Sequence, residues 1–276
     1  MSRVLAISSQ VARGHVGLSA IVPALQVLGN EVIALPTVLL SNHPGHAHVA
    51  GDRIAPEQLR RMLDALSANG WLEEVDAVLT GYLPSAEHVA FAVEAIRRAR
   101  KAHPRTLVLV DPILGDHPNG LYVDKHAAAA IRDSLLPLAA IVKLNVFELE
   151  WLTGARIGDE RDAVLAAATL GPRAVLITSV PAQGRLSNVL VQSGEPAATC
   201  RVEHFDRVPK GTGDLFSALL LAAELAGPGS HAQCMARAVA GVDLVVRTSR
   251  AQDELNLVAS LHALTSVVPL AITELG

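Results

Sequence analysis

The stretch with the clearest chemical potential is PKGTGDLFSALLL, residues 209–221, where two glycines and an acid precede an apolar run. The backbone N–H groups of a turn over Gly211, Thr212 and Gly213, with those of a following helix, would form a concave anion site that suits a phosphate. Asp214 would lie beside that phosphate, where a carboxylate accepts the proton of an attacking hydroxyl group. Alternatively, Thr212 or Asp214 only caps a buried helix. The segment therefore predicts either a phosphoryl-transfer site or a simple helix start.

A turn that carries out chemistry must be held by rigid helices and strands, and the sequence pattern predicts both. Short apolar runs alternate with amphipathic helical patterns, which is typical of a parallel sheet covered by helices on both faces. The predicted buried strands are residues 3–8, 31–36, 75–80, 106–111, 139–144 and 174–179. The predicted helices are residues 55–70, 85–102, 231–247 and a region around 253–266. Residues 188–193 and 197–205 have no helix between them and predict an antiparallel hairpin at an edge.

Polar residues follow the predicted strands where the chain enters the next loop. Ligands bind at the carboxyl ends of the strands in such sheets, so these residues are candidates for a common site. They are Ser8, Ser9, Gln10, Asp111, Asn145, Glu148, Thr178 and Ser179, with the turn before Asp214 completing the set.

Composition narrows the classes of function. The 276 residues are 50% hydrophobic and 18% charged, which favours one domain over 1–276 with a large core. The net charge of −4, without a basic run, argues against a nucleic-acid partner. Two distant cysteines and no signal peptide or membrane-length apolar stretch predict a soluble, cytoplasmic protein. His43, His46 and His48 lack zinc-ligand spacing, and neither GxxxxGK[ST] nor GxGxxG occurs.

Seven segments, in order, resemble the pyridoxal kinases of the ribokinase-like superfamily. They are GHVGLSA (14–20), SNHPGH (41–46), TGYLPS (80–85), DPILGD (111–116), NVFELEWLTG (145–154), VLITS (175–179) and GTGDLFSALLLA (211–222). The resemblance implies a three-layer α/β sandwich, with a mostly parallel central sheet and an antiparallel edge, that usually forms a homodimer. It also implies ATP-dependent phosphorylation of the 5'-hydroxymethyl group of pyridoxal, pyridoxine or pyridoxamine. Magnesium would be a cofactor, and potassium or sodium a further candidate.

The same resemblance assigns roles at the phosphate end of the site. Asp214 matches the catalytic base, and the backbone of Gly211, Thr212 and Gly213 matches the anion hole. Asp111 and Glu148 match acids that act near the ATP phosphates through magnesium or its waters, as carboxylate oxygens suit a hard cation. The positions matched to the triphosphate or its accompanying ion are Asp116, Asn145, Thr178, Ser179 and Thr212.

At the substrate end, the resemblance places Ser9, His43 and Tyr82 around the pyridine ring. Tyr122 falls in a segment, residues 115–124, whose two glycines and one proline suit a flap that closes over ATP. We call residues 115–124 the flap. The resemblance thus predicts a substrate end and a nucleotide end, with Asp214 between them.

Five positions depart from the pattern of the family that the chain resembles. Pro44 replaces a threonine near the ring, and Leu121 stands where some relatives carry a reactive cysteine. Lys143 and Leu144 replace a common Thr-Pro, and Lys210 precedes the turn where a small or apolar residue is commoner. Either lysine can neutralise phosphate charge, or Lys143 only reshapes its turn. Two other functions remain open: a kinase for another heterocycle such as hydroxymethylpyrimidine, and a noncatalytic protein that binds pyridoxal phosphate or ATP.

Overall fold

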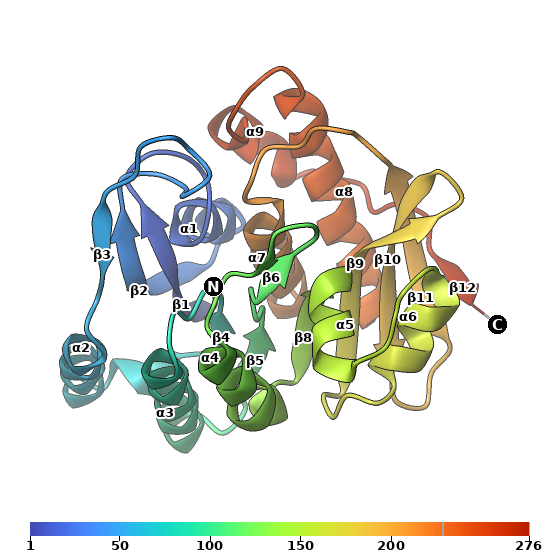
Figure 1. The fold of residues 1–276 in the computed structure, drawn as a ribbon. Coiled ribbons are helices and arrows are strands. Elements are labelled where there is room, and N and C mark those ends of the chain that lie inside the picture. Colours follow the sequence, from blue (N-terminus) through green and yellow to red (C-terminus); the bar gives the residue numbers. More distant parts are fainter. Residues whose placement is uncertain (228, 276) are drawn as a thin grey trace.

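A twisted sheet forms the centre of the computed structural model, which describes residues 1–227 and 229–275. Within these residues, ten strands lie in the order β12-β11-β10-β9-β8-β5-β4-β1-β2-β3 (Figure 1). The strands are β1 (Arg3–Val11), β2 (Glu31–Leu40), β3 (Gly51–Arg53), β4 (Ala77–Thr80), β5 (Leu107–Val110), β8 (Ile141–Asn145), β9 (Ala174–Ala182), β10 (Arg185–Gln192), β11 (Ala197–Glu203) and β12 (Thr273–Leu275). Strands β2, β1, β4, β5, β8 and β9 pair in parallel, whereas the pairs at both edges are antiparallel.

The central strands are apolar on both faces because each face packs against helices. In β1, Leu5 and Ile7 enter the core on one side of the sheet, while Val4 and Ala6 enter the core on the other. This alternation follows from the two-residue period of side chains along a strand. A run without polar residues is therefore the sequence signature of a sheet buried between two layers.

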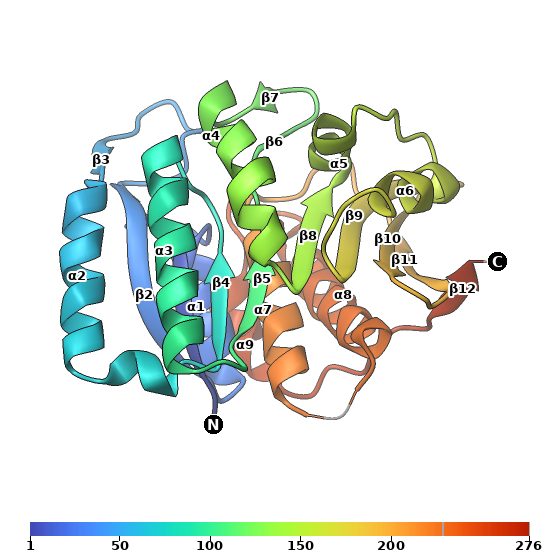
Figure 2. The same cartoon turned by 90° about the horizontal axis from the view of Figure 1, so that it is seen from below.

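Helices cover both faces, as Figure 2 shows from a second direction. One layer contains α2 (Pro56–Ala68), α3 (Ala86–Ala102), α4 (Lys125–Ala130), α5 (Val146–Thr153) and α6 (Glu160–Ala167). The other contains α1 (Leu18–Val27), α7 (Thr212–Leu225), α8 (His231–Ser249) and α9 (Leu257–Leu264). Short helical turns occupy Trp71–Glu74, Ile131–Leu135 and Leu136–Leu138. A separate two-stranded sheet, β6 (Gly115–Asp116) with β7 (Gly120–Leu121), lies within the flap.

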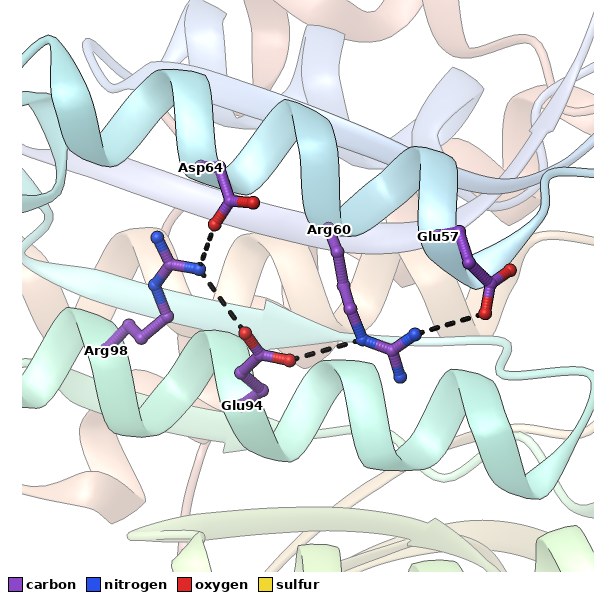
Figure 3. A network of polar contacts seen from close by, with 5 residues as sticks. All are labelled: Glu57, Arg60, Asp64, Glu94 and Arg98. Carbon is purple, nitrogen blue, oxygen red and sulfur yellow. Dashed lines mark hydrogen bonds and ion pairs between the residues drawn. The ribbon is translucent and has the colours of Figure 1, made fainter.

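The outer layer of α2 and α3 is joined by a network of ion pairs on the surface (Figure 3). Arg98 contacts Asp64 at 2.6 Å and Glu94 at 3.3 Å, and Arg60 contacts Glu94 and Glu57 at 3.3 Å each. All five side chains are partly exposed to water, so each pair contributes about 0–1 kcal/mol. The network fixes the relative direction of the two helices, while the apolar core supplies their stability.

The six predicted parallel strands and the predicted hairpin are confirmed, with ends shifted by a few residues. Strands β3 and β12 were not predicted, because each has three residues and β3, with the sequence GDR, is fully exposed. The predicted helix around 253–266 is shorter, since α9 spans Leu257–Leu264. Short edge strands carry little hydrophobic pattern, so sequence alone rarely reveals them.

The parallel strands bring their carboxyl ends to one edge of the sheet. At that edge, β1, β4 and β5 lead into loops, β8 runs directly into α5, and the N-terminal end of α7 comes from the layer that also contains α1, α8 and α9. Helix α7 is buried from Leu215 to Ala222, so the turn before it rests on a packed element. No helix in the described part of the chain is long and apolar enough to cross a membrane.

Candidate active site

The turn before α7 has a backbone that only glycine adopts without strain. Gly211 has a φ of 102°, and a Cβ placed on it would lie 1.8 Å from the carbonyl oxygen of His15. Gly211 is the N-cap of α7 and has no side chain, so no side-chain cap is made from this position. Among the described residues the capping alternative therefore finds no support for Thr212, while the carboxyl of Asp214 keeps a contact with its own backbone N–H. The first N–H groups of α7 are available to an anion.

Asp214 places a carboxylate beside these N–H groups. Its Oδ1 atom is buried and has no hydrogen-bond partner among the described residues. Burial, followed by repulsion from Asp111, raises the pKa of Asp214 from its ordinary value of 3.8 to about 6, although the backbone of Gly17 and the cation of Lys143 oppose the rise. A carboxylate with a raised pKa and a free oxygen is suited to accept a proton from a bound hydroxyl.

Asp111 follows β5 and lies at the centre of a buried polar cluster. Its Oδ2 atom contacts Lys143 Nζ at 2.7 Å and accepts a hydrogen bond from Ser217 Oγ at 2.8 Å. Its Oδ1 atom is buried without a partner among the described residues. Lys143 comes from β8 and Ser217 from α7, so the sheet and the helix layer that contains α7 meet at this carboxylate. One oxygen of Asp111 is held in place, and the other is free for a ligand.

Glu148 and Asn145 form a capping box at the start of α5. Glu148 Oε2 accepts from the backbone N–H of Asn145 at 2.8 Å, and Oε1 accepts from that of Leu114 at 2.9 Å. Asn145 Nδ2 donates to the carbonyl oxygen of Gly115 at 2.8 Å, which ties β8 to the flap. Burial raises the pKa of Glu148 to about 7, and the Lys143 cation opposes this shift. Glu148 therefore positions the backbone around the site, and each of its oxygens already has one donor.

The flap carries a second polar cluster around Asp116. Lys210 Nζ lies 3.2 Å from Asp116 Oδ2, and Asn119 Nδ2 donates to Asp116 Oδ1 at 2.6 Å. Burial raises the pKa of Asp116, but hydrogen bonds from Tyr122, Asn119 and Lys210 outweigh it, so the pKa lies below its ordinary value. The Tyr122 side chain is still 43% exposed. Lys210 immediately precedes the anion turn, so its contact with Asp116 connects the flap to that turn.

The remaining nucleotide-end candidates lie in the middle of β9, where its pairing with β8 ends. Thr178 Oγ1 donates to the carbonyl oxygen of Leu144 at 3.2 Å, and the backbone of Thr178 pairs with that of Asn145. Ser179 has a φ of 61°, a conformation that a non-glycine residue seldom adopts. The structure therefore places Thr178 beside Asn145 on adjacent strands, next to a strained Ser179.

The substrate-end candidates surround the carboxyl ends of β1 and β4. Ser9 packs directly against Gly17. A side chain at position 17 would prevent this contact, since its Cβ would lie 2.3 Å from Ser9 Oγ. Tyr82 is partly buried, and its backbone N–H donates to Ser8 Oγ at 3.1 Å. His43 Nδ1 accepts from the N–H of Gly45 at 2.9 Å, and burial followed by Lys210 lowers the pKa of His43. A largely neutral His43 leaves Nε2 for a ligand.

Two features of this site were not assigned from the sequence. Ser217 lies one turn after Asp214 on α7 and supports Asp111, and the signal that could have revealed it is a lone hydroxyl within the apolar run. Lys143 was noted as unusual, but its ion pair with Asp111 could not be inferred from two residues 32 positions apart in sequence. Such pairs arise from strand order, which places β8 beside β5.

The raised pKa of Asp214 predicts an acid limb in the pH dependence. A base acts in its ionised form, so kcat/KM should fall as the pH drops through about 6, where half of Asp214 is protonated. With the ordinary value of 3.8, the limb would lie about two pH units lower. The measurement is kcat/KM between about pH 5 and pH 8 at constant ionic strength. A rate that stays constant down to pH 5 would contradict the assignment.

Comparison with known proteins gives a consistent picture. The family model described as phosphomethylpyrimidine kinase matches residues 16–257. A pyridoxine/pyridoxal/pyridoxamine kinase of Bordetella avium is 41% identical over 231 residues, covering 81% of this chain and 78% of the relative. The pyridoxal kinase of Homo sapiens is 36% identical over 241 residues, covering 80% and 76%.

A solved structure agrees with these sequences. The pyridoxal kinase of Leishmania donovani in complex with ADP and pyridoxamine superimposes with a TM-score of 0.93 at 27% identity, covering 100% of both chains. The α/β fold with a mostly parallel sheet, inferred from the resemblance, is confirmed. By family model, by curated relatives and by fold, this chain belongs to the phosphomethylpyrimidine kinase family and, within it, to the pyridoxal kinases.

Proposed function

We propose that this chain transfers the γ-phosphoryl group of ATP to the 5'-hydroxymethyl group of pyridoxal, pyridoxine or pyridoxamine. The observation that carries the proposal is the buried, unpartnered Oδ1 of Asp214 beside the open N–H groups of α7. A noncatalytic binding protein has no use for a base at this point. Curated relatives and solved relatives with ADP and vitamers support the same reaction.

The chemistry requires a proton acceptor, an anion site and alignment of the two substrates. Asp214 Oδ1 takes the proton of the substrate hydroxyl as its oxygen bonds to the γ-phosphorus. The bond from that phosphorus to the oxygen bridging it to the β-phosphate breaks, and ADP leaves with the electron pair. The N–H groups of Gly213 and Asp214 face the transferred phosphoryl oxygens and stabilise their charge. Both steps need the turn to stay rigid on α7.

Magnesium would be held at the free oxygen of Asp111. An orphaned, buried carboxylate oxygen is a fitting ligand for this hard cation, and Asp111 Oδ1 meets that description. Each oxygen of Glu148 already accepts a backbone N–H, so Glu148 would act on the ion through its waters. When bound, magnesium would neutralise charge on the ATP phosphates. Asp111, anchored by Lys143 and Ser217, would be the residue that holds it.

The other assigned residues bind and enclose the substrates. We assign Ser9, His43 and Tyr82 to the pyridine ring; Ser9 packs against Gly17, whose backbone lies beside Asp214, and the backbone of Tyr82 donates to Ser8, the neighbour of Ser9. Thr178, Ser179, Asn145 and Asp116 line the nucleotide end. The flap, with Tyr122, closes over ATP and excludes water. We further propose a cytoplasmic homodimer, to be checked by light scattering during size exclusion.

The direct test is ADP release by the purified protein with ATP and magnesium. The panel contains pyridoxal, pyridoxine, pyridoxamine, hydroxymethylpyrimidine and ribose, and each product is identified by mass. Turnover with any of the three pyridines supports the proposal, and ribose serves as the negative control. If a protein preparation that unfolds cooperatively, and is therefore folded, releases no ADP with any compound, a noncatalytic binding protein would be favoured instead.

Hydroxymethylpyrimidine is in the panel because of one specific residue and one comparison. Pro44 stands where a hydroxyl and a backbone donor would face the ring, and the matching family model is described by a pyrimidine kinase. Turnover restricted to hydroxymethylpyrimidine would mean that the pocket around Pro44 recognises that ring. We expect the pyridines to be preferred, because the relatives compared above are named as kinases of pyridoxal or of all three pyridines.

A further inference from the structure

Lys143 is a buried cation in the middle of the catalytic carboxylates. It lies on β8 between β5 and β9, and its side chain is 6% exposed. Its neighbours Val142 and Leu144 enter the core on the α5 side of the sheet, so Lys143 projects to the opposite side, toward α7. The side chain therefore extends from the face of the sheet that packs against α7 and ends beside Gly213 in the anion turn.

The ammonium group is adjacent to the place where a phosphoryl group would bind. Lys143 Nζ contacts Asp111 Oδ2 at 2.7 Å, and it lies 3.1 Å from the position that a Cβ on Gly213 would occupy. An ammonium has three N–H donors, and Asp111 is its one hydrogen-bonding partner across residues 1–227 and 229–275. Two donors are left beside Gly213, where oxygens of the transferred group would lie.

The local charge explains why a cation is stable here. A buried ammonium without a counter-ion is unfavourable. Asp111 Oδ2 lies 2.7 Å from Lys143 Nζ and supplies that counter-charge, and the carboxylates of Glu148 and Asp214 add further negative charge nearby. Three carboxylates and an incoming polyphosphate would otherwise repel one another. A fixed positive charge at this point offsets that repulsion.

Resting on the proposed kinase activity, we infer that Lys143 is a tethered cation that contacts the transferred phosphoryl group and takes the place of an exchangeable potassium or sodium ion. Asp111 Oδ2, an oxygen that could bind such an ion, already holds the ammonium. A covalently attached charge is always present, whereas a free ion must be captured in each cycle.

The first experiment uses the unaltered protein and needs no variant. Turnover is compared in buffer with tetramethylammonium as the monovalent cation and in the same buffer with potassium, sodium or ammonium chloride added. The inference expects equal rates within about twofold, because Lys143 supplies the charge. Activation by more than about tenfold with a small cation would overturn it while leaving the kinase activity established. Absence of turnover in every buffer would refute the proposed function itself.

The second experiment removes the charge with Lys143→Met, which leaves an unbranched side chain that is one heavy atom shorter than lysine. Loss of one preorganised donor to the phosphoryl group should lower kcat by about 10²–10³-fold. Methylammonium or ammonium should restore part of the lost rate, and magnesium-free calorimetry should show that ATP loses more affinity than ADP. Lys101→Met, which removes an exposed lysine of α3, is the control and should change neither quantity.

If Lys143 only stabilises the fold, the second experiment should give a different result. Lys143→Met would then be unstable, its affinities for ATP and for ADP would fall equally, and small amines would not restore the rate. Because the variant leaves Asp111 buried and unpaired, Lys143→Met is also combined with Asp111→Asn, which removes both charges. If that double variant folds and binds ATP and ADP with the unaltered preference, Lys143 does not contact the γ-phosphoryl group and the inference is wrong.

Discussion

Asp214→Asn is expected to lower kcat by about 10²–10⁴-fold, the usual contribution of a positioned general base. The amide has nearly the same shape as the carboxylate but cannot take the proton of the substrate hydroxyl. ATP affinity should be unchanged or higher, since a negative charge beside the polyphosphate is removed. The measurements are single-turnover phosphoryl transfer and ATP binding by calorimetry. The acid limb near pH 6 should disappear from any residual activity.

The control is Asp133→Asn, the same chemical change in the exposed turn Ile131–Leu135 on the α3 side of the sheet. It should leave kcat and the pH profile unchanged. Asp214→Asn should also raise the melting temperature slightly, because burial makes the ionised carboxylate unfavourable in the folded state above pH 6. A variant that keeps most of its turnover would remove Asp214 from the mechanism and leave it as a helix-terminal residue.

The site could be predicted from the sequence because its residues follow directly after local patterns, such as apolar strands, that have a physical cause. Apolar runs without alternation indicate strands buried on both faces, and polar residues at their ends must then lie on one edge. Asp111 and Asn145 were placed together on this basis, and both lie at that edge. The turn at Gly211 was inferred from glycines and an acid before an apolar helix, and its φ of 102° agrees.

What sequence could not give is the direction of individual side chains across the sheet. Glu148 matched a magnesium-linked acid, yet its oxygens are engaged by the backbone N–H groups of Asn145 and Leu114. Lys143 was open to two interpretations until the distance of 2.7 Å to Asp111 was available. Strand β3, with three exposed residues, left no pattern to detect. Pairings between distant residues depend on strand order and register, which local patterns do not encode.

Gly211→Ala tests the other half of the site, the anion turn. At a φ of 102°, an added Cβ would lie 1.8 Å from the carbonyl oxygen of His15, so the turn must move. Movement by about 1 Å at a catalytic turn lowers kcat by about 10²-fold. The left-handed backbone adds a cost of about 1–2 kcal/mol, which lowers the melting temperature by about 2–8 °C. Steady-state kinetics and a thermal melt measure the two effects.

Gly29→Ala separates these causes, because Gly29 has a φ of 82° and no atom within 4 Å of the added Cβ. It shares the backbone cost without the steric clash, so its melting temperature should fall similarly while kcat stays unchanged. If Gly211→Ala and Gly29→Ala have the same kcat, the position of the turn does not control the rate. The open N–H groups of α7 would then lose their assigned role, and Asp214 would act without an anion hole. A selective loss in Gly211→Ala would instead show that phosphoryl transfer depends on the turn as well as on the base.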